Sequence, residues 1–88
     1  MMKRLPVQVE CYAGSRADER PRRVYIEGRR HTVARLLASS TEQAQAATVR
    51  VRRFRVVTED GWQLDLVRTA DGDWFLERKA EMKPQGDH

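Results

Sequence analysis

The chain has 88 residues, of which 40% are hydrophobic and 34% charged, and its formal net charge is +4. This length suits one small domain with a single modest core, and the mixture of both charge signs argues against wholesale disorder. No apolar run reaches the roughly 18 residues of a membrane span, and a lone cysteine, Cys11, excludes a disulfide within the chain. We therefore expect a cytoplasmic protein with no membrane segment, one small β-domain over residues 1–79 and a flexible tail over residues 80–88.

Alternation of apolar and polar residues predicts strands in the first third of the chain. Residues 5–11 and 22–27 alternate with a period of two, and residues 29–34 do so again after a Glu-Gly turn. Residues 13–21 contain Gly, Ser, Asp and Pro without such alternation, which predicts a loop. The residues expected to face the core are Leu5, Val7, Val9, Cys11, Val24, Ile26, His31 and Val33.

The segment around residues 36–48 supports two interpretations. Residues 35–38 are expected to leave the sheet as a turn of helix, and Ser39 followed by Glu42 matches a capping box that begins a helix. Several alanines in the segment also favour helix. No large apolar residue follows Leu37, however, so nothing would dock the helix on the core. We expect at most one short helix or, alternatively, an exposed flexible loop.

Two Asp-Gly pairs, at residues 60–61 and 71–72, divide the last third of the chain. An Asp-Gly pair between alternating apolar runs is a hairpin signal, because both residues tolerate the positive φ of a type I′ turn. The signal predicts an antiparallel meander with strands over residues 53–58, 62–69 and 73–78. The residues expected to face the core in the last two strands are Trp62, Leu64, Leu66, Trp74 and Leu76.

The apolar positions upstream of the first Asp-Gly pair change phase. Val49 and Val51 are out of step with Phe54 and Val56. A bulge at residues 52–53 would restore one apolar face, because one extra residue shifts the alternation by one. The alternative is a strand that begins only at residue 53.

These elements predict a mainly β fold of about six short antiparallel strands. So short a chain buries one apolar face only if the sheet curls strongly. The fold class expected is therefore a twisted sheet or partial small barrel, with an SH3-like barrel as one form.

Several short segments have a familiar order and spacing: residues 9–14, 19–22 and 53–56, Val33 with Leu36 and Leu37, Asp60 with Gly61, and residues 64–68 with Trp74. In these segments the chain resembles a family of short bacterial proteins of unknown function that are built as small β-domains. The resemblance spans residues 6–77 and rests on turns and core positions, so it implies a fold and no activity. Relatives often carry an aromatic residue where this chain has Ser39 and Ser40.

Two surfaces are candidate binding sites. Arginines predicted on one sheet face suit phosphate groups, because the planar guanidinium pairs with two oxygens at once, and an outward aromatic residue would stack on unpaired bases. The alternative is that Asp65, Glu59 and Glu77 pair with these arginines across the sheet. Val67 and Phe75, apolar on the outer face, are a candidate interaction surface. The candidate nucleic-acid or anion-binding residues are Arg23, Tyr25, Arg30, Arg50, Arg52, Arg53 and Arg55.

No catalytic or metal signature is present. Cys11 and His31 would be a nucleophile and base only if adjacent, and a cysteine in the middle of an apolar strand face is usually inert. Cys11, His31 and His88 lack zinc-like spacing. We expect no enzyme activity, cofactor or metal. The leading hypothesis is a protein-interaction or self-association module, whose partner is a protein or a second copy, and the alternative is a nucleic-acid-binding β-barrel.

Overall fold

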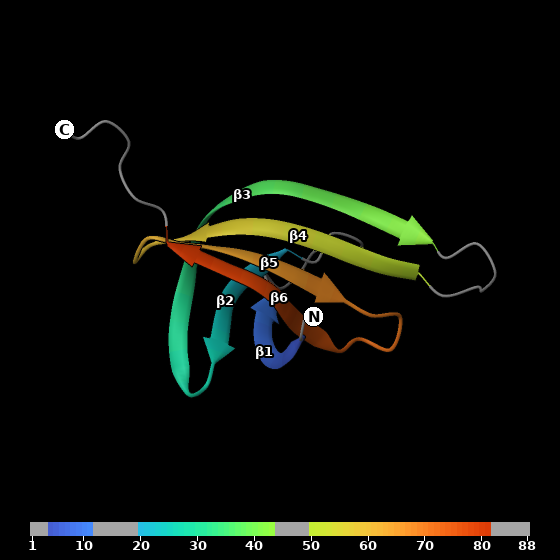
Figure 1. The fold of residues 1–88 in the computed structure, drawn as a ribbon, viewed down its shortest axis with the longest axis horizontal. Coiled ribbons are helices and arrows are strands. Elements are labelled where there is room, and N and C mark those ends of the chain that lie inside the picture. The colour runs from blue at the N-terminus through green and yellow to red at the C-terminus, as the bar shows by residue number, and fades with distance from the viewer. Residues whose placement is uncertain (1–3, 12–19, 44–49, 82–88) are drawn as a thin grey trace.

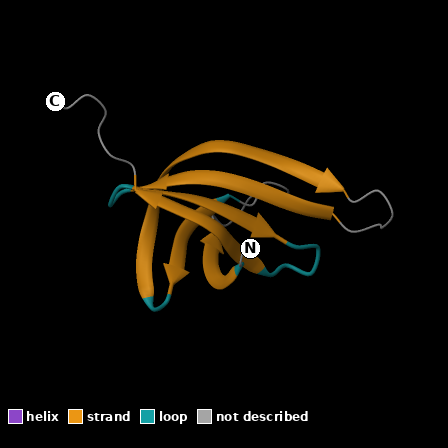
Figure 2. Cartoon of the chain, in the orientation of Figure 1, coloured by secondary structure: helices purple, strands orange, loops and turns teal. Residues whose placement is uncertain are grey.

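The computed structural model describes residues 4–11, 20–43 and 50–81 and consists of six strands (Figure 1). No helix occurs in this part of the chain (Figure 2). The described residues therefore contain no helix that could cross a membrane. The strands are β1 (Leu5–Cys11), β2 (Pro21–Ile26), β3 (Arg29–Gln43), β4 (Arg50–Thr58), β5 (Trp62–Arg68) and β6 (Trp74–Glu81).

The strands form a small closed antiparallel barrel in simple chain order. Each strand pairs with the next, and β1 pairs with both β2 and β6. Closure depends on β1, whose first half pairs with β6 (Leu5 opposite Leu76) and whose second half pairs with β2 (Val9 opposite Val24). The predicted fold class, about six short antiparallel strands curled into a small barrel, is confirmed.

The core lies inside the barrel and comes from alternate residues of the strands. Phe54 and Trp74 pack with ring centroids 5.3 Å apart, while β1 contributes partly buried side chains that alternate with exposed ones. Most positions predicted to face the core do so, because one face of each strand is buried. The buried core residues are Val24, Ile26, Phe54, Val56, Leu64, Leu66, Trp74 and Leu76.

The two Asp-Gly pairs form turns, but the type I′ prediction is wrong for them. Gly61 and Gly72 have φ values of 91° and 92°, whereas neither Asp60 nor Asp71 has a positive φ. Each glycine donates its N–H to the carbonyl three residues earlier, so it follows a type I turn rather than forming part of a I′ pair. The pair with positive φ at both residues is instead Glu27 (49°) and Gly28 (81°), between β2 and β3.

A buried polar group ties β3 to the turn between β4 and β5. His31 is 2% exposed, and its Nδ1 lies 3.0 Å from Oδ2 of Asp60. The Thr58 hydroxyl donates to Oδ1 of Asp60 and accepts the Trp62 N–H at 2.9 Å. The Thr58 bond is the main reason that the pKa of Asp60 lies below its ordinary value. These bonds hold the β4–β5 turn against the start of β3.

The structure corrects the prediction for residues 36–48. Residues 36–43 are neither helix nor loop but the second half of β3, a strand of 15 residues. The carboxylate of Glu42 does not cap a helix and instead accepts from Arg53 Nε at 3.0 Å, across the β3–β4 hairpin. Residues 44–48 lie outside the described residues.

Both interpretations of the phase change before Phe54 are also wrong. β4 begins at Arg50 and pairs without a bulge through residue 55, and the extra residues lie in β3, at Ala34 and Leu37. At the other end of the domain, β6 runs to Glu81. Residues 80 and 81 therefore belong to the sheet and not to the predicted tail, whose remaining residues, 82–88, lie outside the described part.

Candidate functional site

Among the described residues, β3 has a partner strand on one side only from Val33 onward. β2 pairs with β3 over Arg29–Thr32, whereas β4 pairs with it from Val33 to Gln43. In Figure 1, β3 bends at the end of the barrel and then runs beside β4 with no strand along its other side. We call residues 33–43 the open edge of β3. At roughly 3.4 Å per residue, the open edge is about 35 Å long.

The open edge is exposed on both sheet faces. Every residue from Ala34 to Glu42 is exposed, because this part of the β3–β4 hairpin extends beyond the barrel. Leu36 and Leu37 are 38% and 41% exposed. They are the most exposed large hydrophobic side chains within the described ranges. Backbone groups along such an edge are free to pair with another strand.

The register with β4 determines which residues of the open edge share a sheet face. Arg35, Ala38, Ser40 and Glu42 are opposite Val57, Arg55, Arg53 and Val51, which are alternate residues of one β4 face. Ser39 is opposite the buried Phe54 and therefore belongs to the other face. Leu37 is the extra residue of a bulge, so the edge is regular from residue 38 onward.

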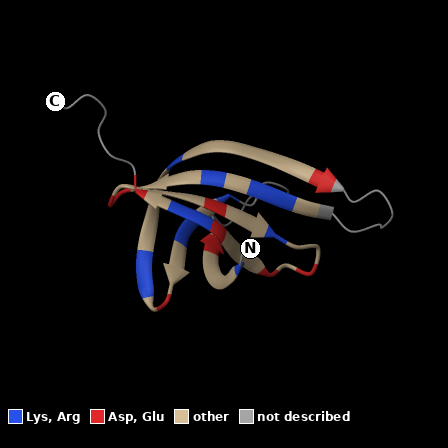
Figure 3. Ribbon diagram, in the orientation of Figure 1, with Lys and Arg blue, Asp and Glu red and all other residues tan. Residues whose placement is uncertain are grey.

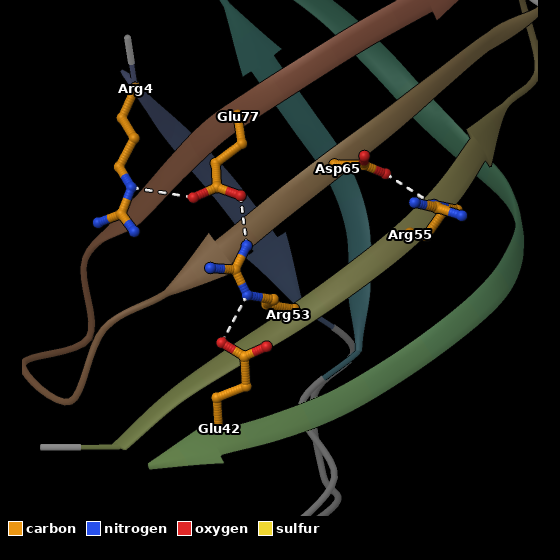
Figure 4. A network of polar contacts seen from close by, with 6 residues as sticks. All are labelled: Arg4, Glu42, Arg53, Arg55, Asp65 and Glu77. Atoms are coloured by element: carbon orange, nitrogen blue, oxygen red, sulfur yellow. Dashed lines mark hydrogen bonds and ion pairs between the residues drawn. The ribbon is translucent and has the colours of Figure 1, made fainter. Parts of the chain in front are cut away.

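A network of ion pairs covers the outer face of β4, β5 and β6 (Figure 4). Arg53 donates to Glu42 and to Glu77, and Glu77 also accepts from Arg4 Nε at 3.0 Å. The hydrogen bond to Glu42 is the largest cause, followed by that to Glu77, for the raised pKa of Arg53. Arg55 donates to Asp65 at 2.9 Å, which raises the Arg55 pKa in the same way. The arginines of this face therefore serve as internal cross-strand partners.

The network predicts unequal effects for its two partly buried carboxylates. Glu77→Gln should lower the free energy of unfolding by about 1–2 kcal/mol, because Glu77 joins two arginines and its side chain is 17% exposed. Asp65→Asn is the matched control and should cost less than about 1 kcal/mol, since its partner Arg55 is half exposed. Urea titrations should show both losses shrinking in 1 M salt. Equal losses would show that the two ion pairs of Glu77 add no more stability than the single ion pair of Asp65.

The structure divides the predicted arginine surface into separate groups. Arg53 and Arg55 share the outer face of β4, but Arg52 is on the opposite face, with its guanidinium carbon 5.0 Å from the Phe54 ring centre. The prediction of one common face is therefore wrong. β4 carries its arginines next to acidic residues of β3 and β5 (Figure 3).

The remaining members of the predicted set lie elsewhere. Arg23 is in β2 and donates to Glu10 of β1 at 2.6 Å. Tyr25 of β2 is opposite Arg30 of β3, close to the Glu-Gly turn. The backbone of Arg50 pairs with Gln43, and its side chain lies outside the described part of the structure.

The predicted interaction surface at Val67 and Phe75 is wrong for Val67. Val67 is on the outer face, as expected, but it is 1% exposed. It lies between Arg53 and Phe75 in the register, so both of these large residues are its neighbours on the same sheet face. Phe75 is half-buried, and its neighbour on the other side is Pro6. The large exposed apolar side chains of the described residues are instead Leu36 and Leu37, in the part of β3 that the alternation pattern did not predict.

The two side chains weighed as a catalytic pair occupy different sites. Cys11 ends β1 opposite Pro21, whereas His31 is buried opposite Val24 and is bonded to Asp60. His88 lies outside the described residues. Within residues 4–11, 20–43 and 50–81, no three potential metal-ligating side chains come together.

A pocket of about 270 Å³ borders the open edge on the outer face. Ala38 and Ser40 line it on the β3 side, Arg53 and Arg55 line it on β4, and Asp65 and Glu77 line it on β5 and β6.

The chain matches no protein-family model, no curated protein and no solved structure. The resemblance to a family of short bacterial proteins therefore stays a prediction. The feature of the structure that bears most directly on function is the open edge of β3.

Proposed function

We propose that the protein is a small, non-enzymatic protein-interaction module that binds a strand of a partner along the open edge of β3. The observation that carries the proposal is the long stretch of β3 that, within residues 4–11, 20–43 and 50–81, has a partner strand on one side only. Strand addition supplies affinity through main-chain hydrogen bonds and specificity through alternate side chains. We further propose that it acts in the bacterial cytoplasm without a cofactor or metal.

The composition of residues 38–43, the part of the open edge that follows its two bulges, favours pairing over protection. Natural proteins guard exposed edges with lysine, proline, inward charges or bulges. From residue 38 to residue 43 the edge has no lysine or proline and no bulge, and Glu42 is its single charge. β6 also extends beyond β1, but that stretch carries Arg78, Lys79 and Glu81, which guard it.

The surface beside the edge leaves room for an added strand. Ala38 and Ser40 are small, and they line a pocket of about 270 Å³. The exposed Leu36 and Leu37 would lose their contact with water when the strand adds.

Nucleic-acid binding ranks second. Three of the arginines it needs, Arg23, Arg53 and Arg55, are held by carboxylates within the chain. Phosphate binding would have to displace these partners. Within the predicted set, Arg30 and the neighbouring Tyr25 still combine an arginine for phosphate with an aromatic ring for stacking on a base.

Peptide display on the intact protein tests the proposed function. Peptides selected from a random 12-residue library should protect amides of the open edge from hydrogen exchange and leave those of β5 unchanged, because β5 is paired on both sides. Binding confined to other strands would overturn the proposal. Binding of single-stranded DNA or RNA that falls steeply with salt and disappears in Arg30→Glu would favour the second candidate.

Proline variants supply the matched control for the display experiment. Successive N–H groups of a strand point to opposite sides, so of Ser39→Pro and Ser40→Pro one removes an N–H from the open edge and the other breaks the pairing with β4. The variant that keeps wild-type stability is the edge blocker, and it should weaken peptide binding by about tenfold or more. Unchanged binding to that variant would show that the peptides bind elsewhere.

A further inference from the structure

We propose that the strand bound by the open edge is β3 of a second copy of this chain, paired antiparallel about a two-fold axis at Ser39. This inference rests on the proposed function and specifies its partner. In a two-fold pair each surface meets itself, so residue i contacts residue j and residue j contacts residue i. The open edge must then be complementary to its own reverse.

The register about Ser39 meets this requirement. Ser39 would be opposite Ser39 of the second copy, and Ala38 opposite its Ser40. Leu37 is the extra residue of a bulge in β3, so Leu36 and Leu37 together would be opposite one residue of the second copy, Thr41. The next pair is Arg35 with Glu42, once on each side of the axis.

The faces of the paired residues agree in this register. Arg35, Ala38, Ser40 and Glu42 share one sheet face, as their pairing with alternate residues of β4 requires. A two-fold axis perpendicular to the sheet preserves faces, so Arg35 and Glu42 of the two copies would meet on that same face. Moving the axis to Ala38 or Ser40 separates Arg35 from Glu42, and then no opposite charges meet.

Both charged groups are available for such a contact. Arg35 is exposed and forms no ion pair within the described ranges. The Glu42 side chain is 60% exposed and uses one oxygen, Oε1, for Arg53. Small side chains at the centre of the edge, Ala38, Ser39 and Ser40, let two sheets join without a steric clash.

A cysteine placed on the proposed axis tests the register directly. Opposite residues of an antiparallel pair have Cα atoms about 4.5 or 5.5 Å apart, within the range that a disulfide bridges. In a Cys11→Ser background, Ser39→Cys should form a covalent dimer under mild oxidation. Thr41→Cys is the matched control, because the two copies of residue 41 would be roughly 14 Å apart. Its yield should be at least about tenfold lower. Equal yields, or none from Ser39→Cys, would overturn the two-fold register.

Charge reversal tests the pairing without a cross-link. Like charges directly opposite destabilise a strand pair, so Arg35→Glu and Glu42→Arg should each shift the full-length protein toward monomer in sedimentation velocity. A mixture of the two variants should associate roughly tenfold more tightly than either alone, because both contacts then join opposite charges. The double variant in one chain should also recover self-association. A mixture no tighter than its components would overturn the proposal.

Peptide binding and the dimer experiments together separate this inference from the proposed function. Peptides that bind the open edge of a protein that stays monomeric and gives no Ser39 cross-link would support strand addition and reject the second copy. If no peptide bound the open edge and no dimer formed through β3, both proposals would be rejected.

Discussion

Leu64→Ala should lower the free energy of unfolding by about 2–5 kcal/mol, which is a large share of the total stability of a domain this small. Leu64 is 0% exposed in the centre of the barrel, between β4 and β6. The substitution removes buried methyl groups and leaves a cavity that the closed barrel cannot readily fill. Urea unfolding followed by the fluorescence of Trp62 and Trp74 measures the loss.

Leu37→Ala is the matched control for this prediction. It removes the same atoms from a side chain that is 41% exposed on the open edge. The change in unfolding free energy should stay within about 0.5 kcal/mol at low protein concentration, where self-association is negligible. A loss at Leu37 as large as that at Leu64 would mean that the open edge is covered in solution.

Asp60→Ala should cost about 1–3 kcal/mol at neutral pH, because it leaves a buried imidazole without its hydrogen bond. His31 is 2% exposed, its Nδ1 bonds Asp60, and its Nε2 has no partner in the described structure. The variant also removes the acceptor of the Thr58 hydroxyl. Asp71→Ala, in the other Asp-Gly turn, is the control and should change stability by less than about 0.5 kcal/mol.

The Asp60 contribution should also depend on pH in one direction. The Thr58 hydrogen bond, first among the causes, lowers the pKa of Asp60 below its ordinary value of 3.8. A carboxylate with a depressed pKa in the folded state stabilises the protein above the unfolded pKa and loses that contribution as pH falls through the folded one. The stability difference between wild type and Asp60→Ala should therefore shrink below pH 3.8. A difference that stays constant down to pH 2 would contradict this account.

The parts of the fold predicted correctly are those in which local pattern and tertiary environment agree. β1 and β2 alternate because one face of each is buried in the barrel, and both were predicted within a residue or two. The two Asp-Gly pairs marked the β4–β5 and β5–β6 turns, since Gly61 and Gly72 supply the positive φ that the chain needs there. The detailed turn type depended on the strand register, which the pair alone does not specify.

The candidate site could not be predicted from local pattern. Residues 36–43 combine helix-favouring alanine and leucine with serines and no alternation, so nothing in them indicates a strand. They form a strand because β4 pairs with them along the whole length of the hairpin. The phase change in β4 did indicate an irregularity, but its own residues do not reveal that the extra ones, Ala34 and Leu37, lie in the partner strand.

Sequence alone determined the β class, the turns and most of the core, because alternation and turn chemistry are properties of neighbouring residues. Only the tertiary structure decided which charges are free and which edge is open, because both depend on pairs distant in the chain. Arg53 meets Glu77, 24 positions away, and β3 passes from β2 to β4 after Thr32, early in its 15 residues. The proposed interaction site exists because β2 ends its pairing with β3 at Thr32, while β3 and β4 continue to pair beyond it.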